Sequence, residues 1–541
     1  MIQYVGMVLV AGACALGGTT PAEGVLLVAL ILGAAGLRSQ SAFEPTPRVW
    51  WTAIALLTLV FAASSAVLVA RDRPIGTDWM AYLKNAVALG ADLPHLYQRW
   101  RGPVHAWMLL LLTPVTGGLI EASQATSLLA AVVCVPLTGW LGFQVGGPLV
   151  GIVAASLLAG WADLRVYAVS STPYPLVACL SLFGTNLVWW VANRASRWGW
   201  APAGLVFGLA YGADLRAATS AVTAALGSWR PGVTRPLLLV LLLTFGVGSA
   251  AIHSLPVELI PLREQVTLQR DLNAREGLGT CPKRGNEPPT FEDLTGRCGR
   301  TTLLANLGRA GGTMPFGLEL FAALFLGGLW HLRGSRLLLG LPVASLAPGL
   351  LMIGVQHRYF VPLAPGLAVI GAGALVALLG GSRLGRVGLA LTTIGLAVGW
   401  HVTPGTFWSR ANGPPSEGFD MAASLVAPSA FVPARAALRA AGPEDRIVDC
   451  TRADLRVRLY PHPVDTSPPA GPGQLSKLCR QLASRGPTAS GTTWLFVAGE
   501  TLAYADAWQV AWTAKDGPST LVLLRAEGAA PKTAPSGAGG R

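Results

Sequence analysis

Long runs of apolar residues, separated by short polar connectors, make up most of the chain. Runs such as residues 50–70, 316–330 and 337–353 are about as long as an α-helix must be to cross the ~30 Å hydrocarbon layer of a membrane. Two earlier runs, 5–16 and 25–37, follow one another without a basic leader, so we expect two retained helices rather than a signal peptide. The pattern predicts a polytopic α-helical membrane protein with about 13 transmembrane helices.

Pairs of arginine in the short connectors indicate the direction in which the chain crosses the membrane, because connectors rich in Arg and Lys stay in the cytoplasm. If all the pairs face the cytoplasm, the segments 71–121, 253–313 and 402–541 lie outside. The pairs are Arg38 and Arg48, Arg194 and Arg197, Arg230 and Arg235, Arg333 and Arg336, and Arg383 and Arg386.

The apolar run 103–120 is the exception to this pattern. Counting it as a full span would invert every connector between it and Arg194. The run is short for a span and is interrupted by Thr113, Pro114 and the pair Gly117-Gly118. We therefore expect a surface helix in the outer interface, within the first outer loop.

The composition supports a membrane protein and indicates which partners the chain binds. Of the 541 residues, 52% are hydrophobic and 12% are charged, whereas an ordinary soluble domain has about 25% charged residues. The net charge is +13, but the basic residues stand in short groups between apolar runs, which is typical of contacts with membrane lipids. We expect a multi-pass protein of the cell (inner) membrane with no nucleic-acid partner.

Four cysteines fall in two polar segments, two in each. Cys281 and Cys298 share the large outer loop 253–313, and Cys450 and Cys479 share the C-terminal segment. This grouping predicts two disulfides and places both segments in an oxidising compartment. The alternative, four free thiols in the cytosol, stays open at this point.

The chain after residue 401 has a different pattern from the rest. The runs 493–498 and 519–524 are strand-like, and 434–441 predicts a short helix. We expect a small α/β domain at 402–527 on the extracytoplasmic side, held by Cys450 and Cys479. The tail, 528–541, is rich in Ala, Pro, Gly and Ser, and this composition predicts disorder.

Charged residues are rare near the predicted outer surface, so those that occur there are candidates for function. In a helix over 78–90, Asp78, Tyr82 and Asn85 share one face. The simpler interpretation is that Asp78 only complements the helix N-terminus, with Thr77 as cap. The remaining candidates are Arg99, Arg101 and His105, then Asp163 and Arg165, Asp214 and Arg216, and finally His357, Arg358 and Tyr359.

Two carboxylates and several basic side chains on one side of a membrane suit a reaction on a phosphate-bearing lipid. Arginine grips phosphate oxygens with two N–H groups, and a carboxylate can take the proton of an incoming hydroxyl. Each group taken alone is more often structural, and Asp163 can simply pair with Arg165. The stronger observation is that all of these groups lie on the same predicted side of the membrane.

The order of these groups resembles the GT-C superfamily of membrane glycosyltransferases, in particular the protein mannosyltransferase and aminoarabinose transferase type. The resemblance rests on the runs 77–82 (Thr-Asp-Trp-Met-Ala-Tyr), 101–107 (Arg-Gly-Pro-Val-His-Ala-Trp), 208–216 (Gly-Leu-Ala-Tyr-Gly-Ala-Asp-Leu-Arg) and 357–363 (His-Arg-Tyr-Phe-Val-Pro-Leu). It implies a core at 50–401 preceded by two extra N-terminal helices at 1–49. The chain departs from the family pattern in having a single acid at its first run and a single proline at its second.

By this resemblance a sugar would move from a polyprenyl-phosphate-linked donor to an acceptor glycan, lipid or protein on the extracytoplasmic face. Asp78 would be the general base or the carboxylate that orients the acceptor, with Asp163 as the second acidic residue. The expected substrate-binding side chains are Tyr82, Arg99, Arg101, His105, Arg216, His357, Arg358 and Tyr359.

Other classes of protein also fit parts of this pattern. Many spans with buried charges suit a lipid or glycolipid transporter or flippase, which predicts charges at mid-membrane depth. A non-catalytic envelope assembly protein would lack converging Asp and Arg side chains. The chain has no His/Cys cluster at zinc spacing and no cofactor is certain, although isolated carboxylates leave a weakly held divalent metal ion as an alternative.

Overall fold

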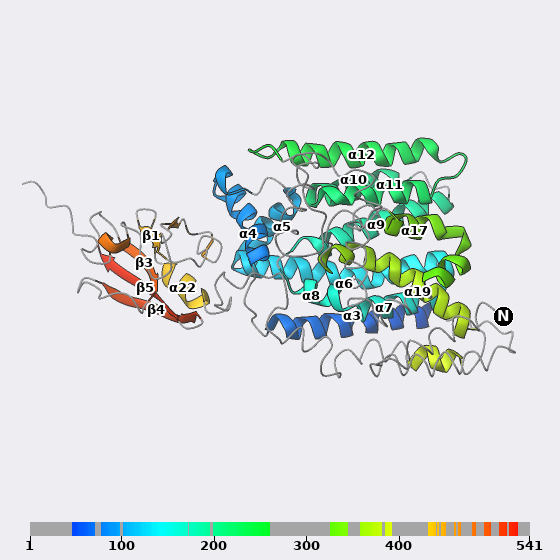
Figure 1. The fold of residues 1–541 in the computed structure, drawn as a ribbon, viewed down its shortest axis with the longest axis horizontal. Coiled ribbons are helices and arrows are strands. Elements are labelled where there is room, and N and C mark those ends of the chain that lie inside the picture. Colours follow the sequence, from blue (N-terminus) through cyan, green and yellow to red (C-terminus); the bar gives the residue numbers. More distant parts are fainter. Residues whose placement is uncertain are drawn as a thin grey trace, which may run out of the picture. The chain divides into compact units, whose positions relative to one another are not determined.

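A computed structural model describes residues 46–70, 77–97, 101–170, 172–194, 198–259, 325–344, 357–380, 385–391 and parts of 431–527. The chain forms two compact units (Figure 1). The first unit consists of Met1–Leu68, Arg99–His105 and Gln124–Pro414. The second unit consists of Val69–Gln98, Ala106–Ser123 and Pro415–Arg541. The predicted N-terminal helices, Arg99, the pair Cys281 and Cys298, and the tail 528–541 lie outside the described residues.

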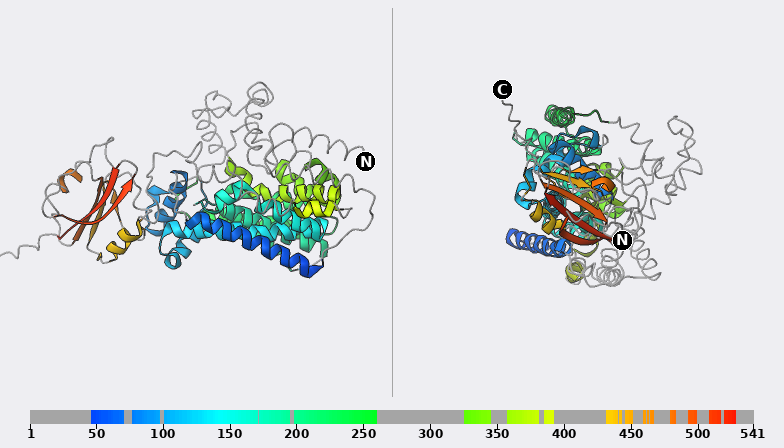
Figure 2. Two further views of the ribbon diagram at one scale, coloured as in Figure 1. Left: turned by 90° about the horizontal axis from the view of Figure 1, so that it is seen from below. Right: turned by 90° about the vertical axis from the view of Figure 1, so that its left-hand side faces the viewer.

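The first unit is a bundle of helices that run side by side (Figures 1 and 2). Its helices are α3 (Pro47–Ala70), α6 (Leu119–Gly146), α7 (Pro148–Ala159), α8 (Ala162–Ala168), α9 (Tyr174–Arg194), α10 (Trp200–Ala213), η2 (Leu215–Ala217), α11 (Ala218–Gly227), α12 (Thr234–His253), η3 (Arg333–Ser335), α17 (Arg336–Ala344), η4 (His357–Leu363) and α19 (Ala364–Leu379).

Length and composition allow five of the described helices to cross a membrane. They are Pro47–Ala66 of α3, Leu119–Gly146, Tyr174–Arg194, Thr234–His253 and Phe360–Leu379. The protein is therefore a membrane protein with a mostly helical fold. The expectation of about 13 spans extends over residues outside the described ranges and stays a prediction.

Glycines on α10 let this helix pack closely along α12. A Cβ atom at Gly204 would lie 2.7 Å from the Cβ of Leu243, and one at Gly208 would lie 2.6 Å from the Cβ of Val247. Small residues at four-residue spacing are a common means of bringing two membrane helices together. Gly208 opens the run 208–216, so part of the sequence resemblance reflects this packing.

A buried amide pair joins α6 to α9. Gln144 Nε2 donates to Asn186 Oδ1 at 2.9 Å. The Asn186 amide donates to the carbonyls of Leu137, at 3.1 Å, and Leu182, at 3.0 Å. Because the side chain of Asn186 is fully buried, its hydrogen bonds replace water and fix the two helices against each other.

The second unit begins with two short helices in the predicted first outer loop, which we call the surface helices. α4 (Thr77–Gly90) and α5 (Val104–Thr116) share a core with the start of α6. α5 has 13 residues and is about 20 Å long at 1.5 Å per residue, which is too short to span the hydrocarbon layer. The core consists of Leu83, Ala86, Val87, Ala106, Leu109, Leu119 and Ile120.

The predicted polar face of α4 is buried as well as its apolar face. Tyr82 is 6% exposed and Asn85 is 2% exposed. The spacing of residues identifies faces of a helix, but burial depends on what packs against each face. α4 is therefore a helix enclosed on two sides and not one with a wet polar face.

The C-terminal part of the second unit contains a five-stranded sheet in the order β2-β1-β3-β5-β4. β1 runs parallel to β2 and β3, whereas β5 runs antiparallel to β3 and β4. The predicted runs 493–498 and 519–524 lie in β3 and β5. The strands are β1 (Arg446–Asp449), β2 (Asp465–Thr466), β3 (Thr492–Ala498), β4 (Gln509–Asp516) and β5 (Ser519–Glu527).

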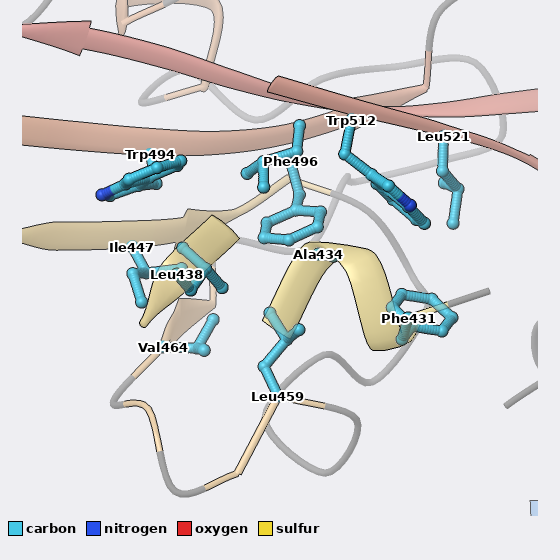
Figure 3. Packing of buried hydrophobic residues seen from close by; sticks show 11 residues of the cluster. Phe431, Ala434, Leu438, Ile447, Leu459, Val464, Trp494, Phe496, Trp512 and Leu521 are labelled. Atoms are coloured by element: carbon cyan, nitrogen blue, oxygen red, sulfur yellow. The ribbon is translucent and has the colours of Figure 1, made fainter. Parts of the chain in front are cut away.

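Helix α22 (Phe431–Leu438) covers one face of this sheet. Trp494, Phe496 and Trp512 lie between the strands and α22 (Figure 3). The opposite face packs on a second apolar cluster that includes the disulfide between Cys450 and Cys479, whose Cα atoms are 5.8 Å apart. This disulfide confirms one of the two predicted cysteine pairs.

Candidate functional site

The turn before α5 lies against the end of α10. Gly102 makes this possible, because a Cβ atom at this position would overlap the carbonyl group of Gly212. Val104 then joins an apolar cluster with residues of α9, α10 and α12, which includes Ala213. Arg101 is thereby held near Asp214, the residue that directly follows α10.

Asp214 holds Arg216 through three hydrogen bonds. Asp214 Oδ1 accepts from the backbone N–H and from Nε of Arg216, each at 2.9 Å, and Oδ2 accepts from Nη2 at 2.5 Å. Arg216 Nη2 also lies 3.4 Å from the hydroxyl of Tyr174, and the guanidinium lies 5.6 Å from the centre of the Tyr174 ring. The Arg216 side chain is 49% exposed, whereas that of Asp214 is 15% exposed. A cation held in one orientation and half-exposed is suited to binding an anion.

The carboxyl group of Asp214 is ionised at neutral pH. Its burial by itself would raise its pKa, but the positive charge of Arg216, the hydrogen bonds from Arg216 and the charge of Arg101 together lower the pKa below its usual value. Asp214 is therefore a counter-ion that offsets one of the two nearby positive charges. The pair of arginines keeps a net positive charge.

His105 stands in the first turn of α5 and is 3% exposed. Burial and the positive charge of Arg101 lower the pKa of His105 to about 3. The imidazole is therefore neutral at neutral pH. It can donate or accept a hydrogen bond beside Arg101, but it adds no positive charge of its own.

Three further elements of the first unit lie together. Helix α8, which carries Asp163, contacts both η4 and α9, and η4 contacts α9 as well. Since η4 begins with His357, Arg358 and Tyr359, and α9 begins with Tyr174, the contacts bring these groups to one region of the fold. Arg165 anchors α8 in the bundle, because its Nε donates to the carbonyl of Ala159 at 2.7 Å.

The predicted residues are thus divided between the two units. Arg101, His105, Asp163, Arg216 and the η4 residues belong to the first unit, and Asp78 and Tyr82 belong to the second. Asp78 is the second residue of α4, which begins at Thr77.

Sequence analysis missed Tyr174 and the role of Gly102. Tyr174 follows Pro173 at the start of an apolar run, a position where an aromatic residue is usually an interfacial anchor. The sequence shows Gly102 only as one residue of the run 101–107, with no sign of its close approach to α10. Within the described ranges, no group of three or more His, Cys, Asp or Glu residues is placed to hold a metal ion.

Helices that can cross a membrane, with a pair of arginines around a carboxylate at one turn, define a polytopic membrane protein with a cluster of positive charge that is suited to an anion. No protein-family model and no curated protein matches the chain. Solved structures do match it.

The chain is similar to ArnT from Cupriavidus metallidurans bound to undecaprenyl phosphate, with 14% identity, 88% of this chain and 98% of ArnT covered, and a TM-score of 0.54. The apo form of ArnT gives 12% identity, coverage of 86% and 97%, and a TM-score of 0.52. An archaeal oligosaccharyltransferase from Archaeoglobus fulgidus gives 12% identity, coverage of 77% and 60%, and a TM-score of 0.46, too low to argue from. The chain therefore has the fold of the GT-C glycosyltransferases, and at this level of identity the likeness shows the fold alone.

Proposed function

We propose that the protein is a membrane glycosyltransferase that moves a sugar from a polyprenyl-phosphate-linked donor to an acceptor on the extracytoplasmic face. The observation that carries this proposal is the pair Arg101 and Arg216, gathered around Asp214. The pair occurs in a chain with the fold of ArnT, which has been crystallised with undecaprenyl phosphate.

The chemistry of transfer fits the charges of this site. The acceptor hydroxyl attacks the anomeric carbon, the bond between this carbon and the phosphate oxygen breaks, and polyprenyl phosphate leaves with additional negative charge. Arg216, held by Asp214, and Arg101 would stabilise that charge as it develops. Neutral His105 would donate a hydrogen bond to the same group.

The proton of the acceptor needs a base. We assign this role to Asp78 or Asp163, since a carboxylate can act as a general base when it is correctly placed. Tyr82, Arg99 and the η4 residues His357, Arg358 and Tyr359 would complete the contacts to the donor and the acceptor. We assign no metal to the site.

The orientation of the chain is part of the proposal. The disulfide between Cys450 and Cys479 supports an oxidising environment for the sheet, outside the cytoplasm. The arginine connectors support a cytoplasmic location, on the opposite side of the membrane, for the ends of the spanning helices near Arg194 and Arg230. An inner-membrane protein of about 13 spans satisfies both.

The test is a transfer assay in proteoliposomes with a panel of radiolabelled polyprenyl-phosphate hexoses and pentoses and an extract of envelope acceptors. We expect transfer from one donor, and a loss of about 100-fold or more for Asp78→Asn or Asp163→Asn, whichever removes the general base. Arg446→Met, which alters an exposed ion pair of the sheet, is the matched control. Movement of a labelled lipid across the membrane without any transfer would instead support the flippase.

A further inference from the structure

The C-terminal sheet is joined to the surface helices of the same unit by an ion pair. Arg435 of α22 meets Glu121 in the first turn of α6, where Nη1 donates to Oε2 at 3.0 Å and Nη2 pairs with Oε1. The two side chains are 11% and 29% exposed. An arginine that binds both oxygens of a partly buried carboxylate fixes orientation as well as distance.

Tyr460 makes a second contact. It packs against the shared core of α4, α5 and the start of α6, as Leu89 and Leu110 also do. A Cβ atom at Gly90, the last residue of α4, would overlap the Tyr460 hydroxyl. The surface helices thus leave room for this side chain.

Gly118 makes room for the ion pair in the same way. A Cβ atom at Gly118 would overlap both Nη1 of Arg435 and Oε2 of Glu121. Both contacts therefore depend on a glycine that precedes or ends a helix. Two side chains from the C-terminal segment fill the spaces that these glycines leave.

Each contact residue directly follows a residue of the sheet's own core. Ala434 and Leu459 are fully buried in the cluster between α22 and the sheet, and Arg435 and Tyr460 come next in the chain. Each contact is thus tied directly to the core of the sheet, so movement of the sheet carries the surface helices with it. Attachment at two separate points also resists rotation about either one.

We propose that the C-terminal sheet is a positioning element, and that Glu121, Arg435 and Tyr460 are positioning residues that hold α4 and α5 in place. α4 carries Asp78 in its first turn and α5 begins at the residues beside Arg101. The role in catalysis rests on the proposed function, whereas the attachment itself does not. The sheet thereby acts on transfer without touching the substrate.

The test compares hydrogen exchange and sugar transfer in the full-length protein in nanodiscs. We expect Arg435→Met to raise the exchange rate of α4 and α5 amides about tenfold, because local opening becomes easier when an attachment is lost. Strands β3 and β5 should exchange as before, which shows that the sheet is folded. Arg446→Met removes the ion pair between Arg446 and Asp465, 2.9 Å apart within the sheet, and should leave α4 and α5 unchanged.

Two further variants separate the ion pair from general damage. Reversing the pair, with Glu121→Arg and Arg435→Glu together, should restore exchange to within about threefold, the remainder reflecting a cation at a helix N-terminus. Gly118→Ala should reproduce Arg435→Met, whereas Gly246→Ala, where a Cβ meets nothing within 4 Å, should not.

The outcomes distinguish this inference from the proposed function. Faster exchange together with a roughly tenfold lower kcat and an unchanged donor KM supports both. Faster exchange in a protein whose wild type transfers no sugar leaves the attachment standing and overturns the proposed function. Unchanged exchange in Arg435→Met, or faster exchange with unaltered kcat in an active enzyme, overturns the positioning role.

Discussion

At the turn after α10, a mostly buried carboxylate holds a half-exposed guanidinium by three hydrogen bonds. Without Asp214, Arg216 would lose the three hydrogen bonds that orient its side chain. A hydrogen-bonded charge of this kind typically contributes about 2 kcal/mol to the free energy of unfolding. The orientation of the Arg216 guanidinium is therefore set by one carboxylate.

Replacing Asp214 tests this pair. Because the pKa of Asp214 is lowered in the folded protein, its stabilisation is present above the unfolded pKa and is lost as the pH falls through the folded pKa. Asp214→Asn should lower the free energy of unfolding by about 2 kcal/mol at pH 7 and by less near pH 3, as followed by thermal unfolding in detergent. Asp92→Asn, at an exposed position, is the control; an equal effect at both pH values would contradict the assignment.

The contribution of His105 to stability has the opposite pH dependence from that of a histidine that gains a negatively charged partner on folding. Its pKa is lowered to about 3, so between pH 6.5 and 3 the unfolded chain binds the proton and the folded chain does not. The protein should lose about 2 kcal/mol of stability between pH 7 and pH 5 through this residue. His105→Gln should remove that loss, measured as the change in Tm between the two pH values, whereas His253→Gln, at an exposed position, should retain it.

Sequence analysis identified Arg101 and Arg216 because charges are rare near the apolar runs. It did not identify Tyr174, since an aromatic residue beside a span has the same pattern whether it binds a cation or only a lipid headgroup. Nor did the spacing of Tyr82 and Asn85 predict their burial. Spacing assigns residues to a face, but only tertiary packing determines what covers that face.

At the scale of elements, the amide pair between α6 and α9 is the clearest test of helix packing. Asn186→Ala should lower the free energy of unfolding by about 1 to 2 kcal/mol, because it breaks the two bonds that Asn186 makes with α6 and leaves the half-buried Gln144 amide without that partner. Asn193→Ala removes an amide on the same helix that donates to the carbonyl of Trp189 one turn away. Equal losses for the two variants, measured by unfolding in mixed detergent, would show that the pair does not join the helices.

Several elements were predictable and others were not. The apolar runs of β3 and β5 stand out in the sequence, but β2 is only Asp465–Thr466 and depends on pairing with β1. Helix α22 begins three residues before the predicted helix at 434–441. Pro433 lies in its first turn, where the missing N–H forms no helical bond, so a residue that usually marks a boundary lies inside the helix.

At the scale of the whole molecule, arginine connectors and a disulfide indicate opposite sides of the membrane. Single cysteines at Trp198, in a connector, and at Val510, on β4, should test this in a protein whose free cysteines are replaced, because both positions are exposed. An impermeant maleimide added to intact cells or spheroplasts should label Val510→Cys and not Trp198→Cys until the membrane is opened. Labelling of both at once, or the reverse order, would contradict the proposed orientation.

The central claim is that the arginine pair binds the phosphate of a polyprenyl lipid, and binding can be measured without knowing the sugar. Native mass spectrometry of the detergent-solubilised protein with undecaprenyl phosphate should show one bound lipid for the wild type and for Arg446→Met. The double variant Arg101→Ala with Arg216→Ala should bind at least about tenfold more weakly, because each lost charge-assisted hydrogen bond is worth about 1.5 kcal/mol or more. Equal binding by the double variant, or no binding by the wild type, would contradict the account.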